Sequence, residues 1–388
     1  MAGSKENRRQ PNEKGMKPDN GLVFPPSILG GFESMHGDYS NGSRVVDNGG
    51  DDYSKIPIII SKGKKWLLTA ETAWAATIRG NKKKVSNIVG GLSCLLYSND
   101  KPTISEECII NDSMEFLVSN TTESGLEAMS LGLPAVHCTA MALFIINKMI
   151  EKEKLSCSGK LEKSIKLMKE SLINSASDIG WGFENRVVDE INIFRLWSTL
   201  WALRALNSTY STLESRVKDK IRKICSRIVH LVPNMALGFT FNDEKKVSIS
   251  ALFVIFISEL CDLQLKKELE EKSEFRNALA FILSGLNSSR HVEVEEYAYA
   301  RKNIEKLSWS HVSAGLGIHA LSLNKIFLSP GEKKILENVV NNIIKSNFRH
   351  IDDNVGYFHF DLLSSDKNDY VIFPTAEMIV GLYFYIHS

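Results

Sequence analysis

Three acidic side chains occupy positions at which a carboxyl group could act as an acid or a base. Glu71, Asp189 and Glu377 each lie at the start of an apolar segment or in the loop before one. An apolar surrounding raises the pKa of a carboxyl group and makes it a proton donor near neutral pH. Each also has a structural alternative, because an acidic residue in the first turn of a helix stabilises its positive end. We take all three as candidate catalytic residues.

Aromatic, basic and sulfur-containing side chains accumulate near the same segment starts and form a second set of candidates. Tryptophan rings could hold an apolar ligand or stabilise a carbocation through cation–π contact, whereas basic side chains and helix N-termini favour an anion. Packing in the core is the structural alternative, especially for the histidines and for Trp197, which shares a helical face with Trp201. The candidate cavity or ligand-binding residues are Trp74, His137, Cys138, Arg195, Trp197, Trp309 and His311, and Glu190 and Asp369 lie in the same regions.

A repeated pattern along the chain must position these residues. A Ser or Thr followed by a small or apolar residue opens an apolar segment six times, at intervals of 51 to 67 residues. These positions are Thr72, Thr139, Thr199, Ser250, Ser313 and Thr375. Amphipathic segments lie between them, at 82–97, 160–175, 212–232, 265–286 and 332–347.

The alternation of the two segment types predicts the fold. A helix that is apolar on every face must be buried on all sides, whereas an amphipathic helix lies outside it. We therefore predict an all-α chain, an α/α toroid of about six inner and five or six outer helices over residues 62–388. Residues 1–55 are rich in Gly, Asn, Asp, Ser and Lys and predict a flexible tail. Its apolar island at 21–32 would either lie across the toroid or dock on a partner protein.

Composition excludes several classes of partner. The chain has 47 Lys and Arg against 46 Asp and Glu, a formal charge of +1, so we expect no nucleic-acid binding. The polar N-terminus has neither a secretory signal nor a myristoylation glycine, and the apolar runs are too short for a membrane span. Six scattered cysteines without a CxxC pair are typical of reduced core residues. These observations predict a cytoplasmic protein.

The stretch 180–206 carries a resemblance to a known repeat. GWGF at 180–183, followed by WSTLWALRAL at 197–206, resembles the prenyltransferase and squalene-cyclase repeat of terpenoid cyclase-like toroids. The resemblance implies that Trp181 and Phe183 pack on helix ends, and that the active end is where the inner helices begin. SWSHVSAGLGIHAL at 308–321 also faintly resembles lanthionine-forming cyclases, but Ser310 stands where a zinc ligand would be needed.

The catalytic motifs of the resembled family are absent from the sequence. There is no Asp-x-Asp-Asp acid, and Asp352-Asp353 lacks the third acidic residue of a magnesium motif. Cys261-Asp262 is at the end of an inner segment, which is the wrong place for a zinc ligand in the cavity. We therefore predict no metal and no cofactor.

Two functions follow, from different classes. We recognise no sixth outer helix, because KIPIIISKGKKW at 55–66 does not read as amphipathic and the chain ends after the sixth inner segment. A partner protein, or the island at 21–32, would then cover the seam between the first and last inner helices. This favours a non-catalytic scaffold or binding subunit of a larger complex. The alternative is an enzyme acting on an isoprenoid or other apolar small molecule through non-standard acids, which requires a cavity with a buried carboxyl of raised pKa.

Overall fold

The computed structural model describes residues 55–68, 85–97, 102–128, 133–189, 194–231, 246–300, 304–360 and 372–388. The chain divides into two units, Met1–Gly50 and Asp51–Ser388, and every described residue belongs to the second. The described part is mostly helical, with three small antiparallel sheets. It contains no helix whose length and apolarity would suffice to cross a membrane.

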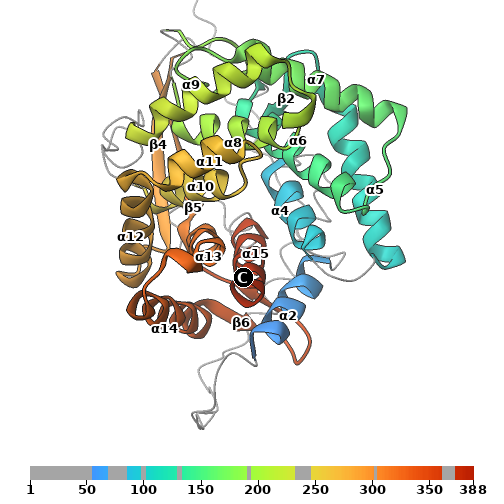
Figure 1. Cartoon of the computed structure of the whole chain (residues 1–388). Helices are drawn as coiled ribbons and strands as arrows, with labels where there is room; N and C mark the ends of the chain where they lie inside the picture. The colour runs from blue at the N-terminus through green and yellow to red at the C-terminus, as the bar shows by residue number, and fades with distance from the viewer. Residues whose placement is uncertain are drawn as a thin grey trace, which may run out of the picture. The chain divides into compact units, whose positions relative to one another are not determined.

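Within the described residues, six helices form a closed inner ring. Each helix packs against the next, and the last packs against the first (Figure 1). Their sequences are almost uncharged, and every residue of the third, α8, is buried. The ring helices are α4 (Val85–Leu96), α6 (Val136–Glu151), α8 (Leu196–Asn207), α10 (Val247–Ser258), α13 (Ser313–Leu323) and α15 (Ile372–His387).

A second set of helices surrounds this ring and buries one face only. In α9, for example, Val217, Ile221, Ile224 and Ile228 are buried at helical spacing while the charged residues face outward. The outer helices are α2 (Ile56–Leu68), α5 (Ile104–Ser119), α7 (Gly159–Ser175), α9 (Ser215–Leu231), α12 (Ser273–Asn287), preceded by the short α11 (Leu263–Glu270), and α14 (Pro330–Asn347). The predicted fold class, an all-α α/α toroid, is confirmed.

The first repeat is displaced from its predicted position. Residues 82–97 were expected to form an outer helix, but α4 lies in the inner ring between α6 and α15. The physical reason is that the charges of NKKK at 81–84 precede the helix, and Val85–Leu96 itself carries none. The outer helix that follows it, α5, was not predicted. The segment opened by Thr72 lies outside the described residues.

The seam of the ring is covered by the chain itself, so the argument for a bare seam was wrong. Residues 56–68 form α2, which packs on α15 and contacts α4. Pro57 falls in the first turn, where proline is tolerated. Ile59, Gly63 and Leu67 form the buried face. A Cβ at Gly63 would come within 2.7 Å of Ile379 Cδ1, so the missing side chain permits this close packing. The island at 21–32 lies outside the described residues.

Short sheets link several outer helices to the next inner helix. They comprise β1 (Thr121–Thr122), β2 (Gly125–Ala128) and β3 (Leu133–Pro134), the pair β6 (Phe348–His350) and β7 (Gly356–Phe358), and the hairpin of β4 (Val292–Ala300) and β5 (Ile304–Val312). The hairpin pairs antiparallel from Val292 opposite Val312 to Ala300 opposite Ile304. Glu293 of β4 accepts hydrogen bonds from the backbone N–H groups of Val247 and Ser248 at the start of α10.

Three of the repeated hydroxyl residues, Thr139, Thr199 and Thr375, hold the segment that precedes their helix. The N–H of Leu126 donates to Thr139 Oγ1 at 2.9 Å, that of Trp181 to Thr199 Oγ1 at 3.0 Å, and that of Phe358 to Thr375 Oγ1 at 3.0 Å. Below, these three contacts are called the threonine latches. They explain the hydroxyl residue at the start of α6, α8 and α15, whereas the Oγ of Ser313 at the start of α13 has no hydrogen-bond partner among the described residues.

Candidate functional site

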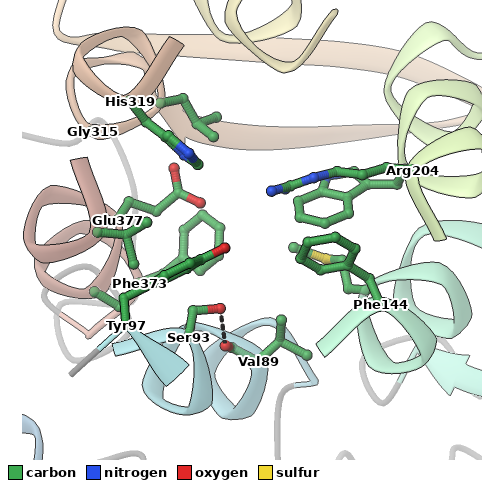
Figure 2. A pocket seen from close by; sticks show the side chains of 15 residues that line it. Val89, Ser93, Tyr97, Phe144, Arg204, Gly315, His319, Phe373 and Glu377 are labelled. Carbon is green, nitrogen blue, oxygen red and sulfur yellow. Dashed lines mark hydrogen bonds between the residues drawn. The ribbon is translucent and has the colours of Figure 1, made fainter. Parts of the chain in front are cut away.

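The ring encloses a small cavity (Figure 2). Its volume is about 40 Å³, enough for a few water molecules or one small chemical group, since about 10–15 Å³ holds one water. Five of the six inner helices contribute to its wall. The lining residues are Val89, Gly90, Ser93, Tyr97, Met141, Phe144, Trp201, Arg204, Gly315, Leu316, His319, Phe373, Ala376, Glu377 and Val380.

Glu377 supplies the only carboxyl group among these lining residues. It lies in α15, and its Oε2 is buried with no hydrogen-bond partner among the described residues. Burial raises the pKa of this carboxyl to about 8, although the positive charge of Arg204 opposes the shift. The carboxyl group is therefore mostly protonated at neutral pH.

A close helix crossing fixes the position of Glu377. A Cβ at Gly315 of α13 would come within 2.5 Å of the Glu377 backbone, and one at Gly381 of α15 within 2.6 Å of the Gly315 carbonyl oxygen. The two glycines thus let α13 and α15 pack backbone to backbone, which brings Glu377 beside the α13 side chains.

Arg204 of α8 lies on the opposite wall as a fixed cation. It is 5 % exposed and forms a two-pronged ion pair with Glu259 at the end of α10, with Nε–Oε2 at 2.6 Å and Nη2–Oε1 at 2.7 Å. Its guanidinium also lies over the rings of Phe144, at 4.0 Å, and Trp201, at 5.0 Å. Burial would lower its pKa, but Glu259 outweighs this and raises it.

One nitrogen of this guanidinium remains available to the cavity. Nε and Nη2 are engaged by Glu259, while Nη1 makes no hydrogen bond within the described ranges. Figure 2 shows the guanidinium pointing across the cavity toward Glu377 and His319.

His319 and Tyr97 complete the polar groups. His319 is buried and stacked on Phe384 at 4.0 Å, and its Nε2 has no partner in the described part of the chain. Burial, and to a lesser extent Arg204, hold the pKa of His319 well below its usual value, so the imidazole is neutral. Burial raises the pKa of the Tyr97 hydroxyl, which therefore keeps its proton.

The candidates predicted from the sequence are distributed over several places. Glu377 lines the cavity. Asp189 is exposed in the loop before α8 and pairs with Arg186. Trp309 and His311 lie in β5, opposite Glu295 and Glu293, and only their backbone is described. Glu71, Trp74, Glu190 and Asp369 lie outside the described residues.

His137, Cys138, Arg195 and Trp197 lie at the starts of α6 and α8, and they are not among the residues that line the cavity. Cys138 Sγ is 3.4 Å from His137 Nε2, but burial raises the pKa of the thiol to about 12 and keeps it protonated. Trp197 packs edge-on against Trp201, with ring centroids 6.2 Å apart. A catalytic or ligand-binding role for these four residues stays a prediction. Trp181 and Phe183 are buried, in keeping with the structural role implied for them.

Sequence reasoning missed Arg204, Glu259, His319 and Tyr97, although the repeat carried a signal. Residues two and five positions after each latch threonine line the cavity: Met141 and Phe144, Trp201 and Arg204, Glu377 and Val380. An arginine at such a position inside an apolar helix is costly to bury unless it has a partner. The position of Arg204, five residues after Thr199, would thus have identified it from the sequence as a cavity residue.

Within the described ranges, no group of three or more His, Cys, Asp and Glu side chains is arranged to hold a metal ion.

Comparison with known proteins supports the fold alone. No protein-family model matches the chain, and no curated protein matches it in sequence. A glycoside hydrolase from family 105 of C. acetobutylicum ATCC 824 has a similar structure, with a TM-score of 0.53 and 11% sequence identity, over 86% of this chain and 99% of that one. An alpha-2-macroglobulin from Salmonella matches with a TM-score of 0.43 and 12% identity, over 82% of this chain and 18% of that one. The second likeness is too weak to support an argument.

Proposed function

We propose that this toroid is an enzyme that binds a small molecule in its central cavity and uses Glu377 as the proton donor. The observation that carries the proposal is a buried carboxyl group with a pKa of about 8 and an unpartnered oxygen in the wall of the cavity. A general acid is most effective when its pKa lies near the working pH. Structural carboxylates that form ion pairs have lowered pKa values instead, as Asp262 has here.

The neighbouring groups suit proton donation. When Glu377 gives its proton to the substrate it becomes a carboxylate, and the fixed cation Arg204 faces it across the cavity and stabilises that charge. Arg204 Nη1 also supports negative charge that develops on a substrate oxygen. His319 is neutral and lies beside Glu377, where it is placed to relay the proton that restores the acid.

The two functions predicted from the sequence are affected differently. The scaffold subunit loses one of its arguments because α2 covers the seam. Of the three candidate acids of the enzyme, Asp189 is exposed and Glu71 lies outside the described residues, whereas the raised pKa of Glu377 supports this alternative. An isoprenoid is a poor match for a cavity of about 40 Å³, so a smaller and more polar substrate is proposed. A toroid among glycoside hydrolases is compatible with catalysis in this fold, but fold likeness does not transfer a reaction.

A screen in heavy water for compounds that the protein converts tests the proposal. The full chain is incubated in D₂O with a small-molecule extract of its host cells, and mass spectrometry detects compounds that are converted and gain deuterium. Wild type and the control Glu115→Gln, which changes an exposed residue of α5, are expected to convert the same compound. Glu377→Gln should slow this conversion by about 10²–10⁴-fold. Conversion by Glu377→Gln at the wild-type rate would overturn the assignment of Glu377.

A further inference from the structure

Several polar groups of the cavity are hydrogen-bond donors without an acceptor. Arg204 Nη1 makes no hydrogen bond to the described residues, and the indole N–H of Trp201, a buried lining residue, has no partner among them. Protonated Glu377 adds an O–H group, and the phenol of Tyr97 adds another. Buried donors without acceptors are costly, so a site of this kind is stabilised by a ligand that brings acceptor oxygens.

The charge of the cavity favours the same type of ligand. Glu259 neutralises Arg204 but engages only two of the guanidinium nitrogens, and Glu377 and His319 carry no charge at neutral pH. An entering anion gains a charge-assisted hydrogen bond from Nη1 and meets no ionised carboxylate in the wall. An entering cation meets the positive charge of Arg204 and a Glu377 carboxyl group that is mostly protonated.

The size of the cavity limits the ligand group to a few atoms. Its volume is about 40 Å³, and Phe144, Trp201 and Phe373 are among the residues that line it. A carboxylate, with three heavy atoms, fits this volume more easily than a phosphate, which is tetrahedral, bulkier and more highly charged.

Building on the proposed function, we infer that the cavity recognises a small carboxylate, held by Arg204 Nη1 and the indole N–H of Trp201 with the Glu377 carboxyl group alongside. The substrate class is accordingly a small carboxylic acid, or a molecule that presents a carboxylate at its end. Glu377 would then donate its proton to an atom adjoining this carboxylate.

Three probes of equal shape and different charge test the inference. Acetate, acetamide and acetamidinium are planar molecules of four heavy atoms and carry charges of minus one, zero and plus one. Binding of each to the full chain at pH 6.5 is measured by saturation-transfer NMR titration. Acetate is expected to bind at least about tenfold more tightly than acetamide, the value of one lost charge-assisted contact, with no detectable binding of acetamidinium.

Variants locate the binding. Trp201→Phe keeps the ring and removes the N–H group, and it should weaken acetate binding several-fold. The double variant Arg204→Met with Glu259→Met removes the ion pair as a unit, so that no buried charge is left alone, and it should abolish binding. Equal binding of the three probes, a preference for acetamidinium, no binding of acetate, or full acetate binding by the double variant would each overturn the inference.

Glu377→Gln separates this inference from the proposed function. Its amide keeps the shape and a donor N–H group, so acetate binding should persist while the heavy-water conversion is lost. If acetate does not bind but the conversion still depends on Glu377, the proposal that Glu377 is the proton donor stands. Only the inference that the cavity recognises a carboxylate is then rejected.

Discussion

At the scale of single residues, the state of Glu377 determines what the cavity can do. Its carboxyl group combines a pKa of about 8 with a neighbouring neutral imidazole and a fixed guanidinium. The same environment makes the native state sensitive to pH, because a native carboxyl that keeps its proton is linked to folding.

Stability should fall as pH rises because of this residue. The pKa of Glu377 is 4.5 when exposed and about 8 in the folded chain, so between these values the native state holds a proton that the unfolded state has released. The stabilisation that the native state gains from holding this proton is complete below about pH 4.5 and is lost progressively as the pH rises to about 8. We expect wild type to lose about 2–4 kcal/mol more than Glu377→Gln between pH 5 and pH 8.5, allowing for partial solvent contact. Urea unfolding at several pH values measures the difference, and parallel curves for the two proteins would contradict it.

The ion pair of Arg204 and Glu259 should act as a unit. Arg204→Met leaves the Glu259 carboxylate, which is 19% exposed, without its partner, and we expect a loss of about 3 kcal/mol in unfolding free energy. Adding Glu259→Met should recover much of that loss. A double-mutant cycle from urea unfolding measures the coupling, and additive effects of the two substitutions would show that the pair is not coupled.

At the scale of elements, the threonine latches bind three linking segments to the inner helices that follow them, α6, α8 and α15. Thr199 Oγ1 accepts from the Trp181 N–H at 3.0 Å and donates to its carbonyl oxygen at 3.2 Å, and Thr375 makes the same pair of contacts with Phe358. Outer helices are capped differently. Thr103 and Ser329 start α5 and α14 with local capping boxes.

Removal of one latch hydroxyl should cost more than its size suggests. Thr199→Val keeps the shape but leaves the buried N–H of Trp181 without a partner, while the Trp181 C=O still accepts from the Arg195 N–H, for an expected loss of about 1–3 kcal/mol. Thr199→Ser keeps the hydroxyl and should cost less. Urea unfolding gives the totals, and hydrogen exchange should show the loss of protection centred on the Trp181 amide. Equal effects of the valine and serine variants would mean that the hydroxyl contributes little.

At the scale of the whole ring, α2 closes the outer layer between α15 and α4. Leu67 is 1% exposed and belongs to a cluster with Ile372 and Ile379 of α15, whereas Ile58 on the same helix is 55% exposed. If the packing of α2 contributes to the stability of the ring, substitution of Leu67 should lower the unfolding free energy far more than substitution of Ile58.

Leu67→Ala is expected to lower the unfolding free energy by about 2–4 kcal/mol, and Ile58→Ala to change it by about 0.5 kcal/mol or less. Urea unfolding compares the two variants with wild type. Similar small effects at both positions would mean that α2 docks too weakly to stabilise the ring.

The fold was largely readable from the sequence because burial leaves a direct pattern. Five of the six predicted inner segments correspond to α6, α8, α10, α13 and α15, since a helix buried on all sides must be apolar throughout. The first repeat was misplaced because α4 and the covering helices next to it differ less in apolar and charged composition than the other helices do. Helix α2 was missed because its isoleucines and proline do not resemble an amphipathic helix.

The sequence by itself determined the alternation of helix types, the recurring hydroxyl at the helix starts and Glu377 as one of three candidate acids. Only the tertiary structure decided that Arg204, Glu259, His319 and Glu377 belong together, because they come from different helices of the ring or their ends. The pKa of about 8 was likewise undetermined by local sequence. Desolvation depends on every helix that excludes water from the cavity, and those helices are distant along the chain.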